Sequence, residues 1–293
     1  MRGNEVIRRL RQAGSVMATL VVVLGSAAVA YGLSPEEERL QEAVTPARAQ
    51  EEKPQFSFAT DILSQYIFRG VAFSRTGLVI QPSFTASYNG LLLNIWGNFD
   101  VKERNPYGRV AVNKGKAAWN ETDFTISYSR EVLPHLTLTV GGIYYLLSHN
   151  TSEYDSIEVY GGVAYKFPWF EVGFAAYREV NRLPGTYLQW YVSRSLELPF
   201  AGASLDLYLG WSAELSNDKF AFPVPDKNIY YHSLHAGQLM ATLNVPLGQY
   251  VKVAPKIIYW YALGGHATKV ISGLSWDGRH NHLLGGVTLT VSF

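Results

Sequence analysis

The chain has 293 residues, of which 14% are aromatic and 17% are charged. Its formal net charge of +1 excludes the broad basic field that a nucleic-acid-binding protein needs. Cysteine is absent, which excludes a disulfide framework, a thiol nucleophile and a cysteine-rich metal site. The 19 Tyr and 7 Trp residues favour a protein of the membrane interface, where amphipathic rings are enriched.

Residues 1–30 have the three parts of a secretory signal peptide. Arginines precede an apolar run from Val16 to Val29, and Ala28-Val29-Ala30 forms a small-residue cleavage site. Because the run is shorter than the ~20 residues of a membrane-spanning helix, we expect cleavage rather than retention as an inner-membrane anchor. Residues 31–55 are charged and contain proline, and we expect a periplasmic N-terminal tail there. The remaining residues, 56–293, form the third segment.

In this third segment, apolar and polar residues alternate over stretches of roughly the 9–11 residues with which tilted strands cross a bilayer. In the last stretch, Leu283, Leu289 and Phe293 fall on one face and His282 falls on the other. This period of two indicates strands with one apolar and one polar face. We expect about twelve strands, at 56–73, 78–88, 91–101, 120–130, 135–148, 154–166, 169–180, 185–197, 202–213, 231–245, 250–261 and 281–293.

The connections between these strands are of two kinds. Every second connection is a tight turn, such as Asn89-Gly90 or Phe167-Pro168. The long connections, at 102–119, 214–230 and 262–280, are the third, ninth and eleventh, so they belong to one side. Outer-membrane barrels alternate short periplasmic turns with longer outer loops, and lipid tolerates no unpaired strand edge. We therefore predict an all-β fold, a transmembrane antiparallel up-and-down β-barrel of about 12 strands with periplasmic termini.

The final strand resembles the closing strand of bacterial outer-membrane β-barrels, because it alternates to the last residue and ends in Phe293. This resemblance implies that Phe293 belongs to the assembly signal that the outer-membrane barrel assembly machinery reads. It also implies a location in the bacterial outer membrane, among outer-membrane lipid and lipopolysaccharide.

A second resemblance begins at Ser64-Gln65-Tyr66-Ile67-Phe68-Arg69-Gly70. Further matching residues are Ser74, Gln81, Gly90, Trp96-Gly97-Asn98, Asp100, Glu121 and Asp123. Over residues 58–145 the chain is similar to the Gcw_chp family of uncharacterised bacterial outer-membrane proteins, whose first strand carries a Tyr-x-Phe-Arg-Gly segment. The resemblance implies a fold and a location, but no established activity.

Twelve tilted strands ~4.8 Å apart enclose a backbone cylinder roughly 24 Å across, which side chains narrow to a bore of about 10–12 Å or less. Strand parity places five large aromatic residues in this lumen: Trp96, Tyr160, Tyr177, Tyr208 and Trp260. They either fill the space by packing or form a stacking surface for a sugar or nucleoside.

Charged residues of inward parity fall at two heights. The expected outer-rim network is Arg69, Asp100, Glu121, Asp123 and Glu179, and the expected inner-rim network is Asp61, Lys166, Glu171, Asp206, Lys252 and Lys256. Buried charges need partners, so these sets either brace the wall through salt bridges or select solutes. We expect Arg69 on the wall of the first strand, at the centre of the outer acidic group.

The third connection is basic, with Lys102, Arg104, Arg109, Lys114 and Lys116 against Glu103. Lipopolysaccharide phosphates are a natural partner for such a loop, and plain solvated charge is the alternative.

We expect a narrow channel or transporter for small polar solutes. A non-conducting structural or adhesive barrel, which contacts lipopolysaccharide or envelope partners, is the alternative, and a lipase-like outer-membrane enzyme is a distant third. No catalytic motif surrounds the histidines, and His232 and His235 point to opposite faces of a strand, which is poor for chelation. We therefore expect no enzyme activity, cofactor or metal.

Overall fold

The structure, a computed structural model, describes residues 53–75, 77–104, 115–147, 155–219, 221–224 and 228–293. All of these belong to the compact unit Tyr31–Phe293. The expected signal peptide, 1–30, lies outside the described residues, and so does the tail up to residue 52. Among the described residues, no helix is long and apolar enough to cross a membrane.

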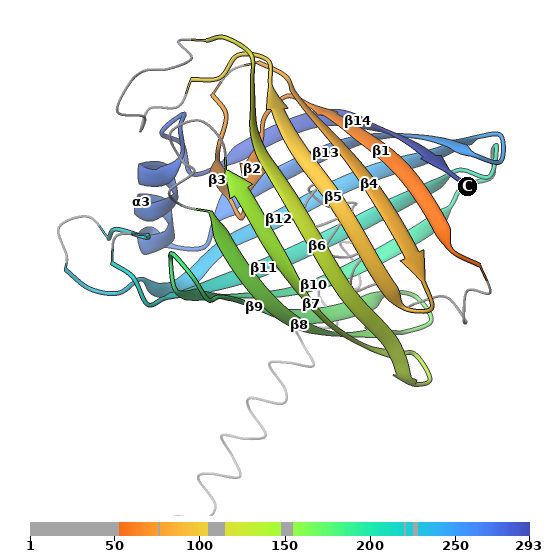
Figure 1. The fold of residues 1–293 in the computed structure, drawn as a ribbon, viewed down its shortest axis with the longest axis horizontal. Helices are drawn as coiled ribbons and strands as arrows, with labels where there is room; N and C mark the ends of the chain where they lie inside the picture. Colours follow the sequence, from red (N-terminus) through yellow and green to blue (C-terminus); the bar gives the residue numbers. More distant parts are fainter. Residues whose placement is uncertain (1–52, 76, 105–114, 148–154, 220, 225–227) are drawn as a thin grey trace, which may run out of the picture. The chain divides into compact units, whose positions relative to one another are not determined.

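Twelve strands close into one antiparallel barrel in the part of the chain that the structure describes (Figure 1). The first, β1 (Gln55–Leu63), pairs with the last, β14 (His282–Ser292), and with β4 (Val79–Tyr88). The others pair with their sequence neighbours, namely β5 (Leu91–Asp100), β6 (Ala118–Leu133), β7 (Leu136–Leu147), β8 (Ser156–Lys166), β9 (Glu171–Glu179), β10 (Gly185–Glu197), β11 (Ser204–Ser216), β12 (His232–Leu247) and β13 (Val251–Ala262). The predicted barrel of about 12 strands is therefore confirmed.

Alternation along the strands produces a barrel with an apolar outside and a largely polar or aromatic inside. On β5, Leu91, Leu93 and Ile95 are exposed on the outer face. Between them, Asn94 and Trp96 are buried on the lumen face. An apolar outer surface suits contact with lipid. Closure of the barrel also pairs the backbone groups of each strand with those of its neighbours, so no strand edge is exposed to lipid.

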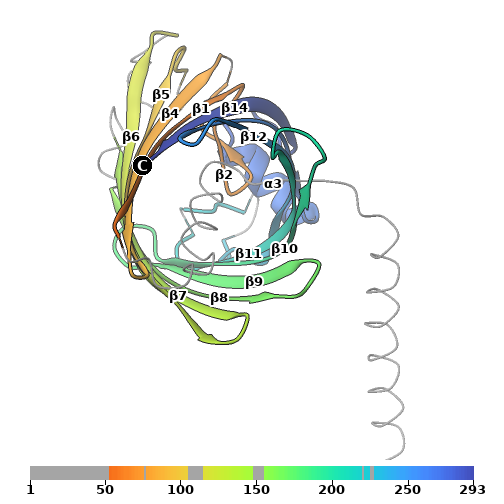
Figure 2. The ribbon, with the colours of Figure 1, turned by 90° about the vertical axis from the view of Figure 1, so that its right-hand side faces the viewer.

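The expected first strand, 56–73, is wrong in its second half. The wall strand β1 ends at Leu63, and the chain then forms a separate two-stranded hairpin of β2 (Ile67–Phe68) and β3 (Val71–Ala72). Figure 2, which looks along the barrel, shows this hairpin inside the ring of strands. The strands of an inward hairpin show the same alternation of side chains as the strands of the wall. The period of two therefore cannot distinguish a hairpin in the lumen from a continuation of the wall strand.

The long connections lie at one end of the barrel. The hairpin and the helix α3 (Gly265–Leu274), which lies between β13 and β14, share this end, and the C-terminus lies at the other (Figure 1). Tight turns join the strands at the end that holds the C-terminus. The sequence predicted the parity of these connections but not the helix within the eleventh.

Candidate functional site in the barrel lumen

We define the lumen hairpin as residues 64–75, and its tip is a two-residue turn. Phe68 pairs with Val71, and the intervening Arg69 and Gly70 both have positive φ, of 50° and 86°. Two positive φ values match a type I′ turn, which suits the twist of a short hairpin and favours glycine. A Cβ on Gly70 would lie 2.8 Å from the Cβ of Ala236 on β12, so glycine also permits close approach to the wall.

Arg69 at this tip forms a two-point ion pair with Glu158 on β8. Its Nη1 and Nη2 donate to the Glu158 Oε1 and Oε2 at 2.7 and 2.8 Å. The pair is largely buried, with 12% and 6% of the two side chains exposed. Because the pair is bidentate and buried, it is strong, and it fixes the orientation of the guanidinium relative to the carboxylate.

The hairpin crosses the bore. It leaves the wall at the end of β1, and in the ring of twelve strands β9 is six steps from β1 in both directions. The Arg69 guanidinium contacts β8 through Glu158, β9 through Tyr177 and β10 through Tyr187. The hairpin therefore spans from one wall to the opposite wall.

Aromatic rings enclose the guanidinium. The Arg69 Cζ lies 4.1 Å from the ring centroid of Tyr187, 4.7 Å from that of Phe68 and 5.0 Å from that of Tyr177. These distances are within the range of cation–π attraction, which strengthens as water is excluded. The Tyr145 hydroxyl donates to the Glu158 Oε2 at 2.9 Å and so orients the carboxylate.

The sides of the hairpin sit in an apolar core within the lumen. Tyr66, Ile67, Val71 and Ala72 are at most 4% exposed and share a cluster with lumen aromatics. The Tyr66 ring lies 5.7 Å from that of Trp96. Packing of this kind orders the hairpin through apolar burial, in addition to the ion pair at its tip.

All five predicted lumen aromatics are inward and buried. Trp96, Tyr208 and Trp260 belong to the cluster that holds the hairpin, and Tyr160 and Tyr177 belong to a second cluster. Tyr160 stacks on Tyr177 with ring centroids 5.1 Å apart. The arrangement fits packing, the first of the two alternatives, around the hairpin.

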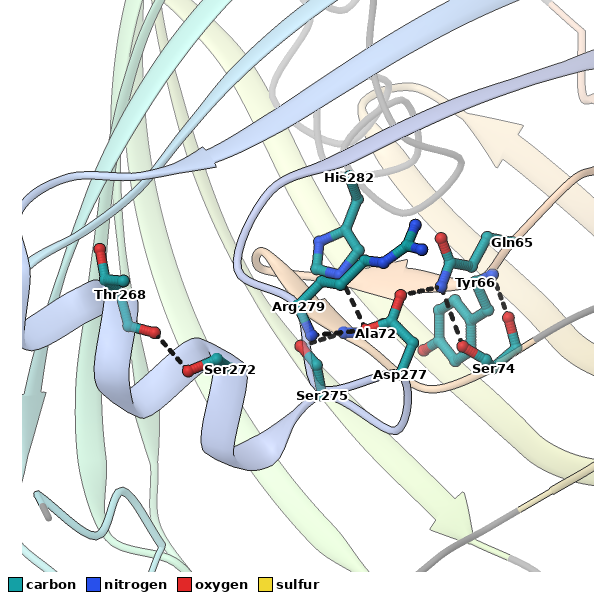
Figure 3. A network of polar contacts seen from close by, with 10 residues as sticks. All are labelled: Gln65, Tyr66, Ala72, Ser74, Thr268, Ser272, Ser275, Asp277, Arg279 and His282. Carbon is teal, nitrogen blue, oxygen red and sulfur yellow. Dashed lines mark hydrogen bonds and ion pairs between the residues drawn. The ribbon is translucent and has the colours of Figure 1, made fainter.

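The connection between β13 and β14 forms hydrogen bonds with the base of the hairpin, as Figure 3 shows, and we call this set of hydrogen bonds the clasp. The Ala72 amide donates to the Ser275 Oγ at 3.1 Å, and the Trp276 amide donates to the Ala72 carbonyl at 2.8 Å. The Gln65 Nε2 donates to the Asp277 Oδ2 at 2.9 Å. Hairpin and loop are thus joined by hydrogen bonds between segments about 200 residues apart in sequence.

Asp277 is the acceptor at the centre of this clasp. Burial alone raises the pKa of its carboxyl, but hydrogen bonds from Gln65 and the Arg279 amide, together with the neighbouring His282, lower the pKa below its ordinary value of 3.8. The carboxylate form is therefore the one that the clasp stabilises.

The outer-rim prediction needs one correction. Arg69 is not on the wall, and its ion-pair partner is Glu158 rather than an acid of the predicted network. Asp100 and Asp123 are buried on the lumen side, and Glu121 is partly buried. Glu179 accepts from the backbone amides of 181–183 and so stabilises its own loop.

The structure brings several of the expected inner-rim residues together, and Asp61 lies two residues before Leu63, where β1 ends and the hairpin follows. The Lys256 Nζ lies 3.1 Å from the Asp61 Oδ1. Lys166 and Glu171 are cross-strand partners. The remaining two are Asp206, which accepts from Ser195 and Asn244, and Lys252, which pairs in register with Thr290.

In the basic loop, Lys102, Arg104 and Lys116 are exposed, whereas Glu103 is only 3% exposed. Asn120 donates to the Glu103 Oε1, so this acid is a structural acceptor. Arg109 and Lys114 lie outside the described residues.

The two strand histidines point to opposite faces, as predicted. His235 is 1% exposed, and its Nδ1 lies 3.0 Å from the Tyr231 hydroxyl. His232 is exposed, and its Nε2 lies 3.0 Å from the Ser216 carbonyl oxygen.

Sequence reasoning missed Glu158, Tyr145, Tyr187, Glu214 and Asp277. The first three have inward parity on predicted strands, and that parity was an available signal. Glu214 directly follows the expected strand 202–213 and was assigned to the connection after it, whereas β11 extends to Ser216. What could not be read was their proximity to Arg69, because this depends on the hairpin crossing the lumen. The Arg69-Gly70 dipeptide was a turn signal, and it was outweighed by the alternation around it.

The fold and its apolar exterior define the class: an outer-membrane β-barrel of porin-like architecture. The chain belongs to the family described as "Bacterial protein of unknown function (Gcw_chp)", whose model matches residues 48–203, more than half of the chain. The resemblance to this family is confirmed, and the Tyr-x-Phe-Arg-Gly segment contains the strand β2 and the turn at the tip of the lumen hairpin.

Solved structures with a similar fold include the NanC porin, at 11% identity over 81% of this chain and 98% of that chain, with a TM-score of 0.48. The KdgM porin is 11% identical over 82% of this chain and 99% of its own, with a TM-score of 0.45. An outer membrane channel from Pseudomonas putida F1 is 11% identical over 85% of this chain and 100% of its own, with a TM-score of 0.45. At such identities the likeness concerns the fold alone. No curated protein matches the chain significantly.

Proposed function

We propose that the protein is a narrow channel of the bacterial outer membrane for small polar solutes, exported by a cleaved signal peptide, with the lumen hairpin as its constriction. The observation that carries this is the path of the hairpin from β1 to Glu158 on the far side of the bore. A segment that crosses the lumen restricts the width available to any solute.

The polar wall supports passage below the hairpin. Buried inward side chains there include Ser127, Ser129, Thr137 and Thr139, together with the Asp61–Lys256 pair. Buried polar groups are costly unless they meet partners or water. Their retention fits a lumen that hydrated solutes enter.

Planar-bilayer conductance of the purified full-length protein tests the proposal. We expect small single-channel steps from the natural protein and larger steps when residues 66–73 are replaced by a short Gly-Ser linker. A matched variant with Phe167→Ala in an inner turn keeps the natural conductance. If neither the natural protein nor the linker variant conducts, the barrel is a non-conducting scaffold.

The basic outer loop suggests a second role, as a contact for lipopolysaccharide phosphates. Lys102 and Arg104 are exposed on one side of the loop and Lys116 is exposed on the other. The Glu103 amide donates to the Lys116 carbonyl and so joins the two sides. We expect the triple substitution to Gln to weaken co-purification of lipopolysaccharide without changing conductance. Unchanged retention would remove this role.

A further inference from the structure

The wall that receives Arg69 is built like a binding site for a cation. Tyr177 and Tyr187 are cross-strand partners, and Tyr187 is also the partner of Glu214 on β11. Their rings lie against the guanidinium at 5.0 and 4.1 Å. Aromatic faces beside a carboxylate are the groups that recognise guanidinium and ammonium ions in water-poor sites.

Two buried carboxyl groups interact with the Arg69 guanidinium, Glu158 through the ion pair and Glu214 through a longer-range electrostatic interaction. Glu158 is 5% exposed and Glu214 is 3% exposed, and Glu214 interacts electrostatically with both Arg69 and Glu158. Glu179 is the register partner of Glu158, but backbone amides occupy its oxygens. The wall therefore holds a second buried carboxyl group beside the carboxylate that pairs with Arg69, and both offer oxygen acceptors to the N–H groups of a cation.

A further polar group of this wall has no partner in the described part of the chain. The Tyr177 side chain is 1% exposed, and its hydroxyl oxygen makes no hydrogen bond to any described residue. A buried hydroxyl without a partner is costly. It offers a hydrogen-bonding group to a molecule that enters the site.

From this geometry we propose that the wall formed by Glu158, Glu214, Tyr145, Tyr177 and Tyr187 is a binding site for small organic cations that carry a guanidinium or amine group. Arg69 occupies it as a tethered competitor. A solute cation that takes the place of Arg69 releases the hairpin tip from the opposite wall. The proposal rests on the lumen hairpin being the constriction of the proposed channel, and it names the solute class of that channel.

A tethered competitor lowers the affinity of the site for a free ligand, because the tip is present at high effective concentration. Removal of Arg69 must therefore strengthen binding. This sign distinguishes a displaced competitor from a residue that helps to bind the solute, since loss of the latter would weaken binding.

Calorimetric titration of the folded full-length protein with agmatine measures the effect, and urea serves as the uncharged probe. We expect weak binding to the natural protein, binding at least about tenfold tighter to Arg69→Ala, and loss of that gain in Arg69→Ala/Glu158→Gln. Arg69→Ala/Asp206→Asn, which changes a carboxylate at the other rim, keeps the gain. Urea binds none of them measurably.

Two results overturn the site: agmatine binding to Arg69→Ala no tighter than to the natural protein, or a gain that survives Glu158→Gln. Heat-modifiable migration in gels checks that each variant is folded, and Arg69→Gln replaces Arg69→Ala if the latter does not fold. Calorimetry does not depend on conduction. A barrel that binds agmatine through Glu158 without conducting ends the channel proposal alone, and one that conducts without this binding ends the site alone.

Discussion

The wall and the lumen hairpin follow the same alternating sequence pattern but are held by different forces. Each wall strand pairs with two neighbours along its length, so backbone hydrogen bonds fix its place whatever the individual side chains are. The hairpin has two strands of two residues each. Its position depends on a few side chains: the Arg69–Glu158 pair, the apolar cluster in which Tyr66 lies beside Trp96, and the hydrogen bond from Gln65 to Asp277. The hairpin is therefore the part of the molecule that single substitutions can move.

Two buried ion pairs, one at the hairpin tip and one in the wall, should differ in how much they contribute to stability. Glu158→Ala removes the carboxylate that pairs with Arg69 at the hairpin tip, and Asp61→Ala removes the carboxylate that pairs with Lys256 between wall strands. Removal of one partner from a buried pair costs about 3–5 kcal/mol where the remaining charge cannot reach water. We expect urea unfolding in bilayers to show a loss of this order for Asp61→Ala, with unchanged conductance.

For Glu158→Ala we expect a smaller loss of stability and a larger conductance, because a released hairpin can carry Arg69 to water. The difference between the two variants measures the mobility of the hairpin. If both lose the same stability and neither changes conductance, the hairpin is as fixed as the wall.

The second test uses two glycines with similar backbone angles. Gly70 has φ of +86° and Gly248 has φ of +82°, so alanine strains both by about 1 kcal/mol. A Cβ on Gly70 would lie 2.8 Å from the Cβ of Ala236, whereas a Cβ on Gly248 would have no atom of the described residues within 4 Å. We expect Gly70→Ala to cost about 1–2 kcal/mol more than Gly248→Ala in equilibrium unfolding. Equal losses would show that the tip does not press on β12.

The same contrast explains what could be predicted from the sequence. Wall strands such as β10, found at the expected 185–197, follow from a period of two and from turn residues between segments, because the closed ladder leaves little freedom in register. Inward parity was right for Trp96, Tyr177 and Trp260 for the same reason. A regular architecture is determined by a pattern that local sequence displays.

The site could not be predicted in this way, because it joins segments through a chain path that leaves the ladder. The fragment before Arg69 alternates correctly for a wall strand, yet β1 stops at Leu63. The contact between Arg69 and Glu158 spans 89 residues and requires the hairpin to cross the bore. Local sequence patterns contain no information about that crossing. The predicted partners of Arg69 were therefore the acids that would lie near it if residues 64–73 continued the first wall strand.

The third test concerns the clasp and acidity. The lowered pKa of Asp277 means that its hydrogen bonds stabilise the folded loop above the ordinary value of 3.8, and that this contribution disappears as pH falls through the lower folded pKa. We expect the conductance to rise as pH drops below 3.8, and Asp277→Asn to have the higher conductance already at neutral pH. Asp155→Asn, in a different outer loop and bonded to Leu147, is the control and keeps the natural profile. A natural profile in Asp277→Asn would exclude the clasp as a restraint on the hairpin.

We expect the smallest change in conductance from a disulfide that joins two neighbouring strands of the wall. Lys166 and Glu171 are register partners across the tight turn in which the Phe167 and Phe170 rings stack, with centroids 4.8 Å apart. Cysteines at 166 and 171 therefore share one face, and they should form a disulfide in a chain that has no other cysteine. Cysteines at 166 and 172 point to opposite faces and should not.

Because the wall does not move when the hairpin does, the 166–171 disulfide should leave conductance and its response to Arg69 substitutions unchanged, as measured before and after reduction. A conductance that changes on reduction would mean that the barrel wall, and not the hairpin alone, takes part in opening.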